Sequence, residues 1–226
     1  MDILVPIILC FIPFITVLLL LKILVDGISI IKELFICSII LIAVIPVSVL
    51  QFFFGPWMPL TNVGASSVLI RAVILFGLIE EGIKCSTLLL FPVKKIDSKK
   101  MFWYSLLAGL FFGSFESVIY VLHAIQNASS RGELLLNMIY IRSFTSLLVH
   151  GFAAGMLGLF VYTFKKTKKV MLGAVLSPII LHGIYDFFAI MNAPLNYFSY
   201  VTILLLLVEC RVYYIKAKEL DVNSVN

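Results

Sequence analysis

The chain has 226 residues, of which 62% are hydrophobic and 13% charged, and its mean hydropathy is +1.13. Soluble domains carry about 25% charged residues, so the charged side chains are too few to cover a water-soluble particle of this size. The net charge of +5 does not indicate a nucleic-acid-binding protein, because the basic residues form short clusters between hydrophobic runs. We therefore expect a multi-pass protein of the cell membrane that contacts the lipid bilayer and no nucleic acid.

Seven hydrophobic stretches are long enough to cross the hydrocarbon layer, which takes about 20 residues per helix. In chain order they are 3–24, 34–54, 67–91, 102–125, 138–163, 170–191 and 196–215. The first stretch has no basic segment before it and no small-residue cleavage site, so we interpret it as a retained helix. The rest of the chain leaves no room for a soluble domain. The prediction is an all-α transmembrane bundle of about seven spans, with residues 1–226 forming one integral membrane domain.

Basic residues predict the orientation of the chain. They gather in the connections after the first, third and fifth stretches and after the seventh. These residues are Lys22, Lys32, Lys94, Lys95, Lys99, Lys100, Lys165, Lys166, Lys168, Lys169, Arg211, Lys216 and Lys218. The opposite connections, 55–66, 126–137 and 192–195, hold a single basic residue, Arg131. The positive-inside rule then puts the N-terminus outside and the C-terminus in the cytoplasm.

Many ionisable side chains fall inside the predicted spans, where a charge costs at least about 2.5 kcal/mol on insertion scales. They are Arg71, Glu80, Glu81, Lys84, Glu116, His123, Arg142, His150, His182 and Asp186. On a helix, Lys84 lies within reach of both glutamates that precede it. His182 and Asp186 are four residues apart, a spacing at which a carboxylate can orient an imidazole.

The depth of four of these residues predicts a shared site. Glu80, His150 and His182 lie within about two residues of the midpoints of their helices, and Glu116 lies about one turn further toward the outer face. Unrelated buried polar groups on four helices would not be expected to agree in depth. We expect one hydrated active site within the helices of residues 67–191.

The order of motifs in this region resembles the PrsW family of intramembrane proteases. The motifs are Glu80-Glu81-x-x-Lys84, Phe115-Glu116-x-x-x-Tyr120, Arg142 with His150-Gly151, and His182-Gly183-x-Tyr185-Asp186-Phe187. His182 and Asp186 also match the HxxxN/D motif of the related CAAX prenyl endopeptidases, whereas Lys84 departs from their EExxxR motif. The resemblance implies an endopeptidase that cuts a single-pass membrane protein. In PrsW-like proteins this substrate is an anti-sigma factor, cut near the outer face as the first step of regulated proteolysis.

Two mechanisms suit these residues, and both stay open at this stage. In the first, Glu116, His150 and His182 hold a zinc ion with one open position, and Glu80 or Glu81 takes the proton of the water. In the second, no metal is bound. Glu80 or Glu81 then activates the water together with His150, while His182 and Asp186 stabilise the oxyanion.

Two other functions use the same kinds of residue. A proton- or cation-coupled transporter would line its pathway with buried carboxylates and histidines, but it would usually show inverted repeats, which we do not find. A non-catalytic binding or immunity protein would have lost part of the polar set, and every expected position is present. The four cysteines lack CxxC spacing and lie in or beside hydrophobic stretches, so we interpret them as buried thiols.

Overall fold

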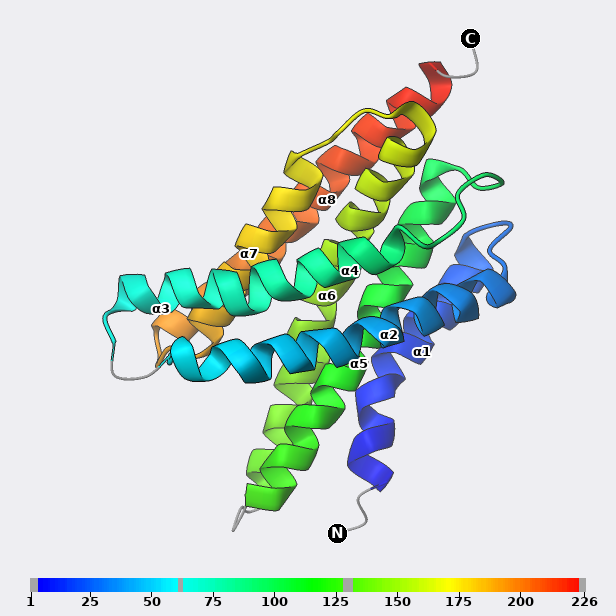
Figure 1. The fold of residues 1–226 in the computed structure, drawn as a ribbon. Coiled ribbons are helices and arrows are strands. Elements are labelled where there is room, and N and C mark those ends of the chain that lie inside the picture. The colour runs from blue at the N-terminus through cyan, green and yellow to red at the C-terminus, as the bar shows by residue number, and fades with distance from the viewer. Residues whose placement is uncertain (1–3, 61–62, 128–131, 224–226) are drawn as a thin grey trace.

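The computed structural model describes residues 4–60, 63–127 and 132–223, although the side chains of 123–124, 126–127, 132–143 and 220–223 lie outside the description. The described chain is helical and contains no strand. The α-helices are α1 (Leu4–Leu24), α2 (Ile30–Phe54), α3 (Ala65–Ala72), α4 (Ile79–Leu88), α5 (Ser98–Asn127), α6 (Gly132–Thr167), α7 (Gly173–Ala189) and α8 (Phe198–Asn223). Two 3₁₀ turns, η1 (Gly55–Trp57) and η3 (Leu195–Tyr197), adjoin α2 and α8. A π-helical segment, η2 (Val73–Leu78), joins α3 and α4 into one continuous rod (Figure 1).

The expected helical membrane bundle is confirmed. Each predicted hydrophobic stretch contains one helical rod, and five rods within the described residues are long and apolar enough to cross a membrane. The rod from α3 to α4 is not among the five, since it carries four charged residues, and α7 is only 17 residues long. The boundaries differ most at the end of α8, which reaches Asn223 rather than residue 215, and at the start of α6, and α2 begins at Ile30 rather than at residue 34. The shift in α2 brings Glu33 into the helix.

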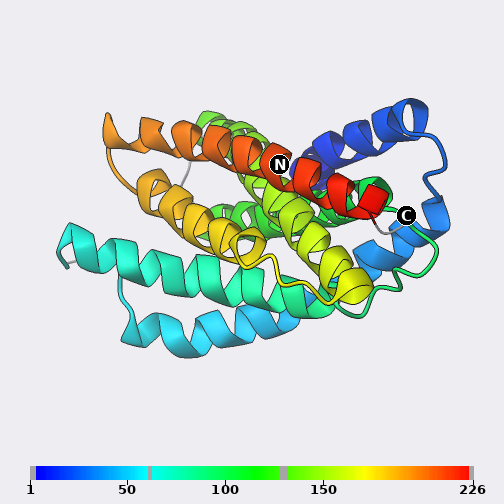
Figure 2. The same ribbon diagram turned by 90° about the horizontal axis from the view of Figure 1, so that it is seen from above.

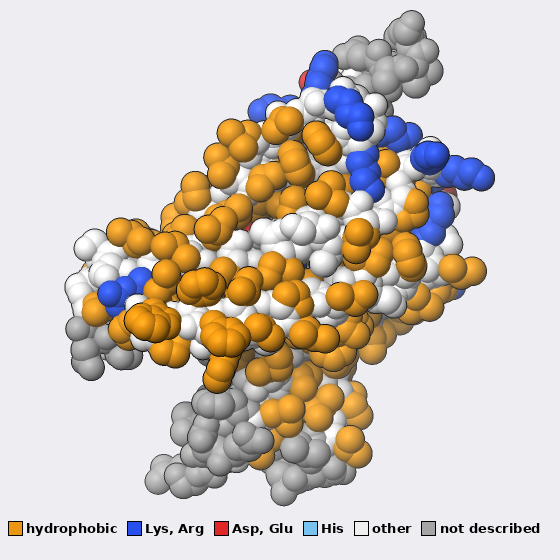
Figure 3. Space-filling view, viewed as in Figure 1, with side chains coloured by type: hydrophobic (Ala, Val, Ile, Leu, Met, Phe, Trp, Pro, Cys, Tyr) orange, Lys and Arg blue, Asp and Glu red, His pale blue; other side chains and the backbone are white. Residues whose placement is uncertain are grey.

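The helices form two crossing groups. In Figure 2, α8, α7, the α3–α4 rod and α2 lie side by side in that order, and the contacts between the neighbouring elements agree. The α5–α6 pair crosses this group at an angle, with α1 against α5 (Figure 1). The outer faces carry exposed apolar side chains such as Ile31, Phe52 and Leu204, which suit contact with lipid (Figure 3). The centre of the molecule is therefore where α4, α5, α6 and α7 meet.

Glycines allow the helices to come close at this centre. A Cβ atom added to Gly77 of η2 would overlap the backbone of Ile179 in α7, and one added to Gly183 would overlap the backbone of Val73. A Cβ on Gly113 of α5 would press against the imidazole of His150 in α6. Small residues at helix crossings permit such contact of backbones in membrane proteins. Here they bring α4, α5, α6 and α7 within side-chain reach of one another.

Most lysines lie at one end of the molecule, near the C-terminus (Figure 3). Lys165 Nζ donates to the carbonyl of Phe91 at 2.8 Å, which joins the end of α6 to the loop after α4. Arg71 donates to the carbonyl of Pro59, in the connection between α2 and α3. The Lys165 contact therefore places two of the predicted basic loops, the one after α4 and the one after α6, next to each other. Arg131 and the side chains of His123 and Arg142 lie outside the described residues.

Candidate active site

The six candidate residues come together from four helices. Glu80 and Glu81 are in the first turn of α4, directly after the π-helical segment, and Glu116 lies on α5. His150 lies on α6, and His182 and Asp186 lie on α7. Lys84 completes the group one turn along α4 and is fully buried. The predicted i,i+4 pair on α7 is present, because His182 Nε2 lies 3.1 Å from Asp186 Oδ2.

Polar contacts run through the group without a break. His150 Nε2 lies 2.8 Å from Glu116 Oε2, and His150 Nδ1 lies 2.7 Å from Lys84 Nζ. Lys84 Nζ donates to Glu81 Oε1 at 2.7 Å, and the same oxygen lies 2.7 Å from His182 Nδ1. Together with the contact between His182 and Asp186, these contacts connect six side chains, which we name the polar chain. In order, they are Glu116, His150, Lys84, Glu81, His182 and Asp186. The polar chain joins α5, α6, α4 and α7 in turn.

The donors and acceptors assign protons to the two histidines. An ammonium only donates, so the Nδ1 atom of His150 accepts from Lys84, and its Nε2–H donates to Glu116. His150 is thus a neutral imidazole in this arrangement. Both nitrogens of His182 face carboxylate oxygens, of Glu81 and Asp186, so both donate. His182 is the second cation of the group, beside Lys84.

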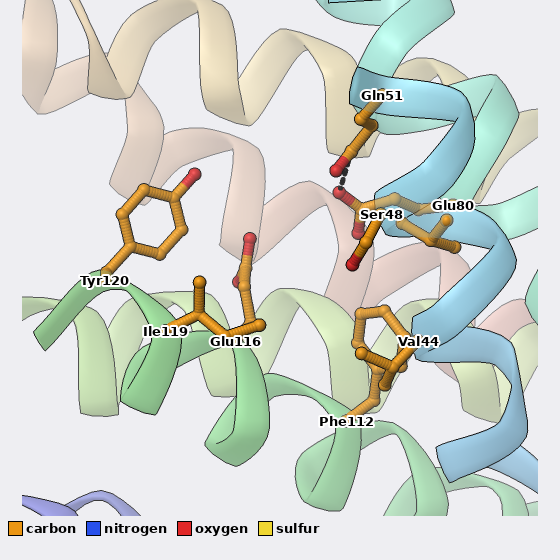
Figure 4. Close-up of a pocket in the computed structure, with 9 residues that line it drawn as sticks. Val44, Ser48, Gln51, Glu80, Phe112, Glu116, Ile119 and Tyr120 are labelled. Carbon is orange, nitrogen blue, oxygen red and sulfur yellow. Dashed lines mark hydrogen bonds between the residues drawn. The ribbon is translucent and has the colours of Figure 1, made fainter. Parts of the chain in front are cut away.

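The two adjacent glutamates face in different directions. Glu80 lines a cavity of about 210 Å³ between α2 and α5, whereas Glu81 points toward Lys84 and His182. Glu116 reaches the same cavity from α5, next to Tyr120, and lies across from Glu80 (Figure 4). Glu116 is one-fifth exposed, so the polar chain reaches open space at this cavity, as it also does at Asp186, which is 17% exposed. A water or a peptide in the cavity would therefore meet Glu80 and Glu116 first.

One part of the group has the donor atoms of a metal site. Carboxylate oxygens of Glu80 and Glu81 and ring nitrogens of His150 and His182 all lie within 4.8 Å of one another. The second oxygens of both glutamates are buried and have no hydrogen-bond partner among the described residues. Glu116 contacts the far nitrogen of His150 rather than this cluster. The role of Glu116 as a metal ligand stays a prediction.

The surroundings of the site hold groups that the sequence interpretation missed. Gln51 of α2 donates from Nε2 to Glu80 Oε1 at 2.8 Å, and Ser146 of α6 donates to Glu116 Oε2 at 2.8 Å. Phe112 of α5 places its ring 4.2 Å from Lys84 Nζ, a cation–π contact. The available signal for Gln51 was its position in the mostly apolar second half of α2, one turn after Ser48. Each of these side chains fixes one charged group of the site.

Comparison with known proteins agrees with the motif order. A family model described as PrsW family intramembrane metalloprotease matches residues 31–210. The Protease PrsW of Clostridioides difficile (strain 630) is 29% identical over 133 residues, which are 55% of this chain and 53% of that protein. The chain thus matches about half the length of this curated relative, and no solved structure matches it. Since the family model covers most of the chain, the protein is a multi-pass membrane protein and belongs to the PrsW family of intramembrane metalloproteases.

Proposed function

We propose that this protein is an intramembrane endopeptidase whose active site is the cavity between α2 and α5 with the polar chain behind it. The observation that carries the proposal is the meeting of Glu80, Glu116, His150 and His182, from four helices, beside one cavity. Peptide hydrolysis needs a base for the water, stabilisation of the oxyanion and a proton for the leaving amine. A charged side chain buried within a membrane costs free energy, and a catalytic function would explain why these charged residues are retained. The family match favours a peptidase over a transporter or a non-catalytic relative.

In the proposed reaction, Glu80 is the base, because it lines the cavity while Glu81 faces inward. Glu80 accepts a proton from the water and passes it to the amine that leaves. Glu116, held by Ser146 and His150, orients the water from the opposite wall. Glu81 and Asp186 hold the ring of His182 from both sides, so they act as positioning groups.

The residues fit a divalent metal such as zinc. Two carboxylates and two imidazoles are the ligand types that zinc takes in proteins, and two carboxylate oxygens there have no hydrogen-bond partner among the described residues. Carboxylates also outnumber cations in the group, four to two, even with His182 counted as charged. We propose that His150, His182 and Glu81 would hold the metal, which leaves Glu80 as the base. His182 would then give up one of its two protons and Lys84 its contact with His150 Nδ1, because a histidine ligand is neutral. When bound, the metal would act as a Lewis acid toward the water and the substrate carbonyl.

The finer assignments extend this proposal. We infer seven spans with the N-terminus outside and the C-terminus in the cytoplasm, supported by the lysines gathered at one end. We take residues 1–226 as one membrane domain. By likeness to the family, the substrate is a single-pass membrane protein of the anti-sigma-factor type, and the cut is made near the outer face. The cavity beside η1, which follows α2 on the predicted outer side, supports that location.

The test is co-expression with candidate single-pass substrates that carry a tag on each side of the membrane. We expect the wild-type protein to release a shortened fragment. Five variants should each abolish cleavage while still inserting: Glu80→Gln, Glu81→Gln, Glu116→Gln, His150→Ala and His182→Ala. Glu209→Gln on α8, which accepts from Ser177 rather than from a member of the polar chain, is the control and should cleave normally. Normal cleavage by all five variants would rule out the protease.

Metal content is measured separately on purified protein. We expect about one zinc per chain in the wild type, less in His150→Ala and His182→Ala, and loss of cleavage in chelator. Full activity in chelator, with no metal in the protein, would instead favour the glutamate mechanism, in which His182 and Asp186 stabilise the oxyanion.

A further inference from the structure

Two hollows meet at one side chain of α2. The active-site cavity lies on one side of Gln51, between α2 and α5. On the other side is an apolar pocket of about 290 Å³, formed by α2, η1, η2 and the residues that follow η1. Its walls include Met58, Leu60 and Phe76. Gln51 is half-buried and lines both hollows, so the two hollows adjoin at this side chain, and we name them together the α2 groove.

The hydrogen bonds of Gln51 leave one of its atoms available. Its Nε2 donates to Glu80 Oε1 at 2.8 Å and to the carbonyl of Leu75 in η2 at 3.2 Å. Both partners only accept, so the amide is oriented with its nitrogen toward them, and both of its N–H bonds are used. The carbonyl oxygen, Oε1, is used by neither of these two bonds. It has no protein partner within the described part of the chain, so it can accept one further hydrogen bond.

We propose that the α2 groove binds the scissile segment of the substrate in an extended conformation, with Gln51 Oε1 accepting a backbone N–H and an apolar side chain filling the pocket beside Met58. This inference rests on the proposed protease function and names the binding site for its substrate. Gln51 is then both a positioning residue for Glu80 and a selector of substrate conformation.

An extended peptide fits the groove better than other occupants do. A helix has its N–H groups bonded internally, so it has none to offer Gln51 except in its first turn. An acyl chain has no donor at all. An extended strand presents N–H groups and places successive side chains on opposite sides at about 3.3 Å per residue. The strand can therefore offer an N–H to Gln51, an apolar side chain to the pocket and a carbonyl to the cavity at Glu80.

Pocket specificity is tested with a set of synthetic peptides in detergent. The peptides vary one position through Ala, Val, Leu and Phe, and mass spectrometry identifies each cleaved bond. We expect Met58→Trp, which fills the pocket, to lower the preference for Leu over Ala at one subsite by about tenfold, since a methylene or two in an apolar pocket is worth that much. Ile45→Trp is the matched control, because Ile45 is an exposed residue of α2 outside both hollows. Its profile should equal that of the wild type.

The hydrogen bond to Gln51 is tested with the same peptides carrying a single N-methyl group. In the wild type, N-methylation at one position should reduce kcat/KM about tenfold, the value of one hydrogen bond. In Gln51→Leu that penalty should vanish, although kcat also falls as Glu80 loses its partner. A merely structural role for Gln51 would leave the ratio of the two peptides unchanged.

The outcomes separate the groove from the protease. If Glu80→Gln abolishes cleavage but Met58→Trp leaves the subsite preference unchanged, the proposed substrate groove is wrong and the protease function stands. A lipid chain occupying the pocket would give this result. An N-methyl penalty equal in wild type and Gln51→Leu would also overturn it. Peptide cleavage that survives in all five active-site variants would overturn the proposed function itself.

Discussion

Two regions of this molecule bury glutamates within helices, and they differ in what surrounds the carboxylates. In the active site, Lys84 and two histidines from other helices contact Glu80, Glu81 and Glu116. Glu33 of α2 is as deeply buried as Glu80, but its one hydrogen bond within the described part of the chain comes from Cys37 Sγ at 3.7 Å. Its other oxygen has no hydrogen-bond partner, and no ion pair joins it to a described residue. The cavity beside it, about 150 Å³ between α1, α2 and α5, is otherwise mostly apolar.

The difference shows that burial of a carboxylate does not by itself identify a catalytic site. A general base needs a route to water and neighbours that bind the proton or the charge at the next step. Glu80 has both, a cavity on one side and Lys84 and His150 on the other. Glu33 has a single weak donor. We therefore assign chemistry to the first region and none to the second.

The largest expected contrast is in activity. Glu80→Gln should lower the cleavage rate of a tagged substrate by about 10²–10⁴-fold, because the amide cannot act as a base. Glu33→Gln, the same chemical change in the other region, should cleave at the wild-type rate. The measurement is fragment release over time at equal protein levels. A comparable loss in Glu33→Gln would break the comparison and make α2 part of the catalytic machinery.

The next contrast is in stability. Lys84→Met removes the buried cation that Glu80 and Glu81 share, so the free energy of unfolding should fall by about 3–5 kcal/mol. Titration with a denaturing detergent measures this change. Lys100→Met, which removes a partly exposed ion pair with Asp97, should cost less than about 1 kcal/mol. Adding Glu81→Gln to Lys84→Met should recover part of the loss, and full additivity of the two changes would show that the pair is not coupled.

A smaller contrast in activity is expected when the residue at the end of each hydrogen-bonded group, Asp186 or Cys37, is replaced. Asp186→Asn removes the negative charge that faces His182 Nε2 and should reduce activity by about 10–100-fold, as loss of an orienting carboxylate does elsewhere. Cys37→Ala takes away the one donor to Glu33 and should leave activity unchanged. Both rates come from the same cleavage assay. If Asp186→Asn cleaves normally, the polar chain ends at His182 and the last contact is structural.

The smallest expected effect is a gain in stability. Glu33→Leu replaces a buried group that lacks a hydrogen-bond partner at one oxygen with an apolar one, so it should raise the free energy of unfolding by about 1 kcal/mol. Leu34→Ile, on the exposed side of the same turn, is the control and should change stability little. The detergent titration used for Lys84→Met detects both. A clear loss of stability in Glu33→Leu would reveal a bound cation or headgroup at the carboxylate.

The sequence predicted those features of the site that lie within one helix or follow from depth. The spacing of Lys84 from the two glutamates and of His182 from Asp186 is local, and both contacts are present. The direction of Glu80 relative to Glu81 was not predictable, because it depends on how α4 is rotated against α2 and α7. The π-helical segment before α4 changes that rotation, and nothing in the residues of η2 signals it.

Other features depend on packing between helices, which periodicity does not report. Gln51 gained its role from the approach of α2 to α4, and Ser146 from the approach of α6 to α5. Glu33 was missed for a simpler reason, since the predicted span began one residue after it. The helices were predictable from hydrophobicity alone, whereas their rotations and crossings were not.

The helices that carry most of the site are also those that lipid accepts least readily. The α3–α4 rod holds Arg71, Glu80, Glu81 and Lys84, and it is not among the five rods that are apolar enough to cross a membrane. A nascent chain that has emerged only as far as α4 leaves these carboxylates without the histidines of α6 and α7. We expect the rod to enter the bilayer from the translocon only after α6 and α7 have been synthesised. Insertion of the rod into the membrane and assembly of the site would then occur together.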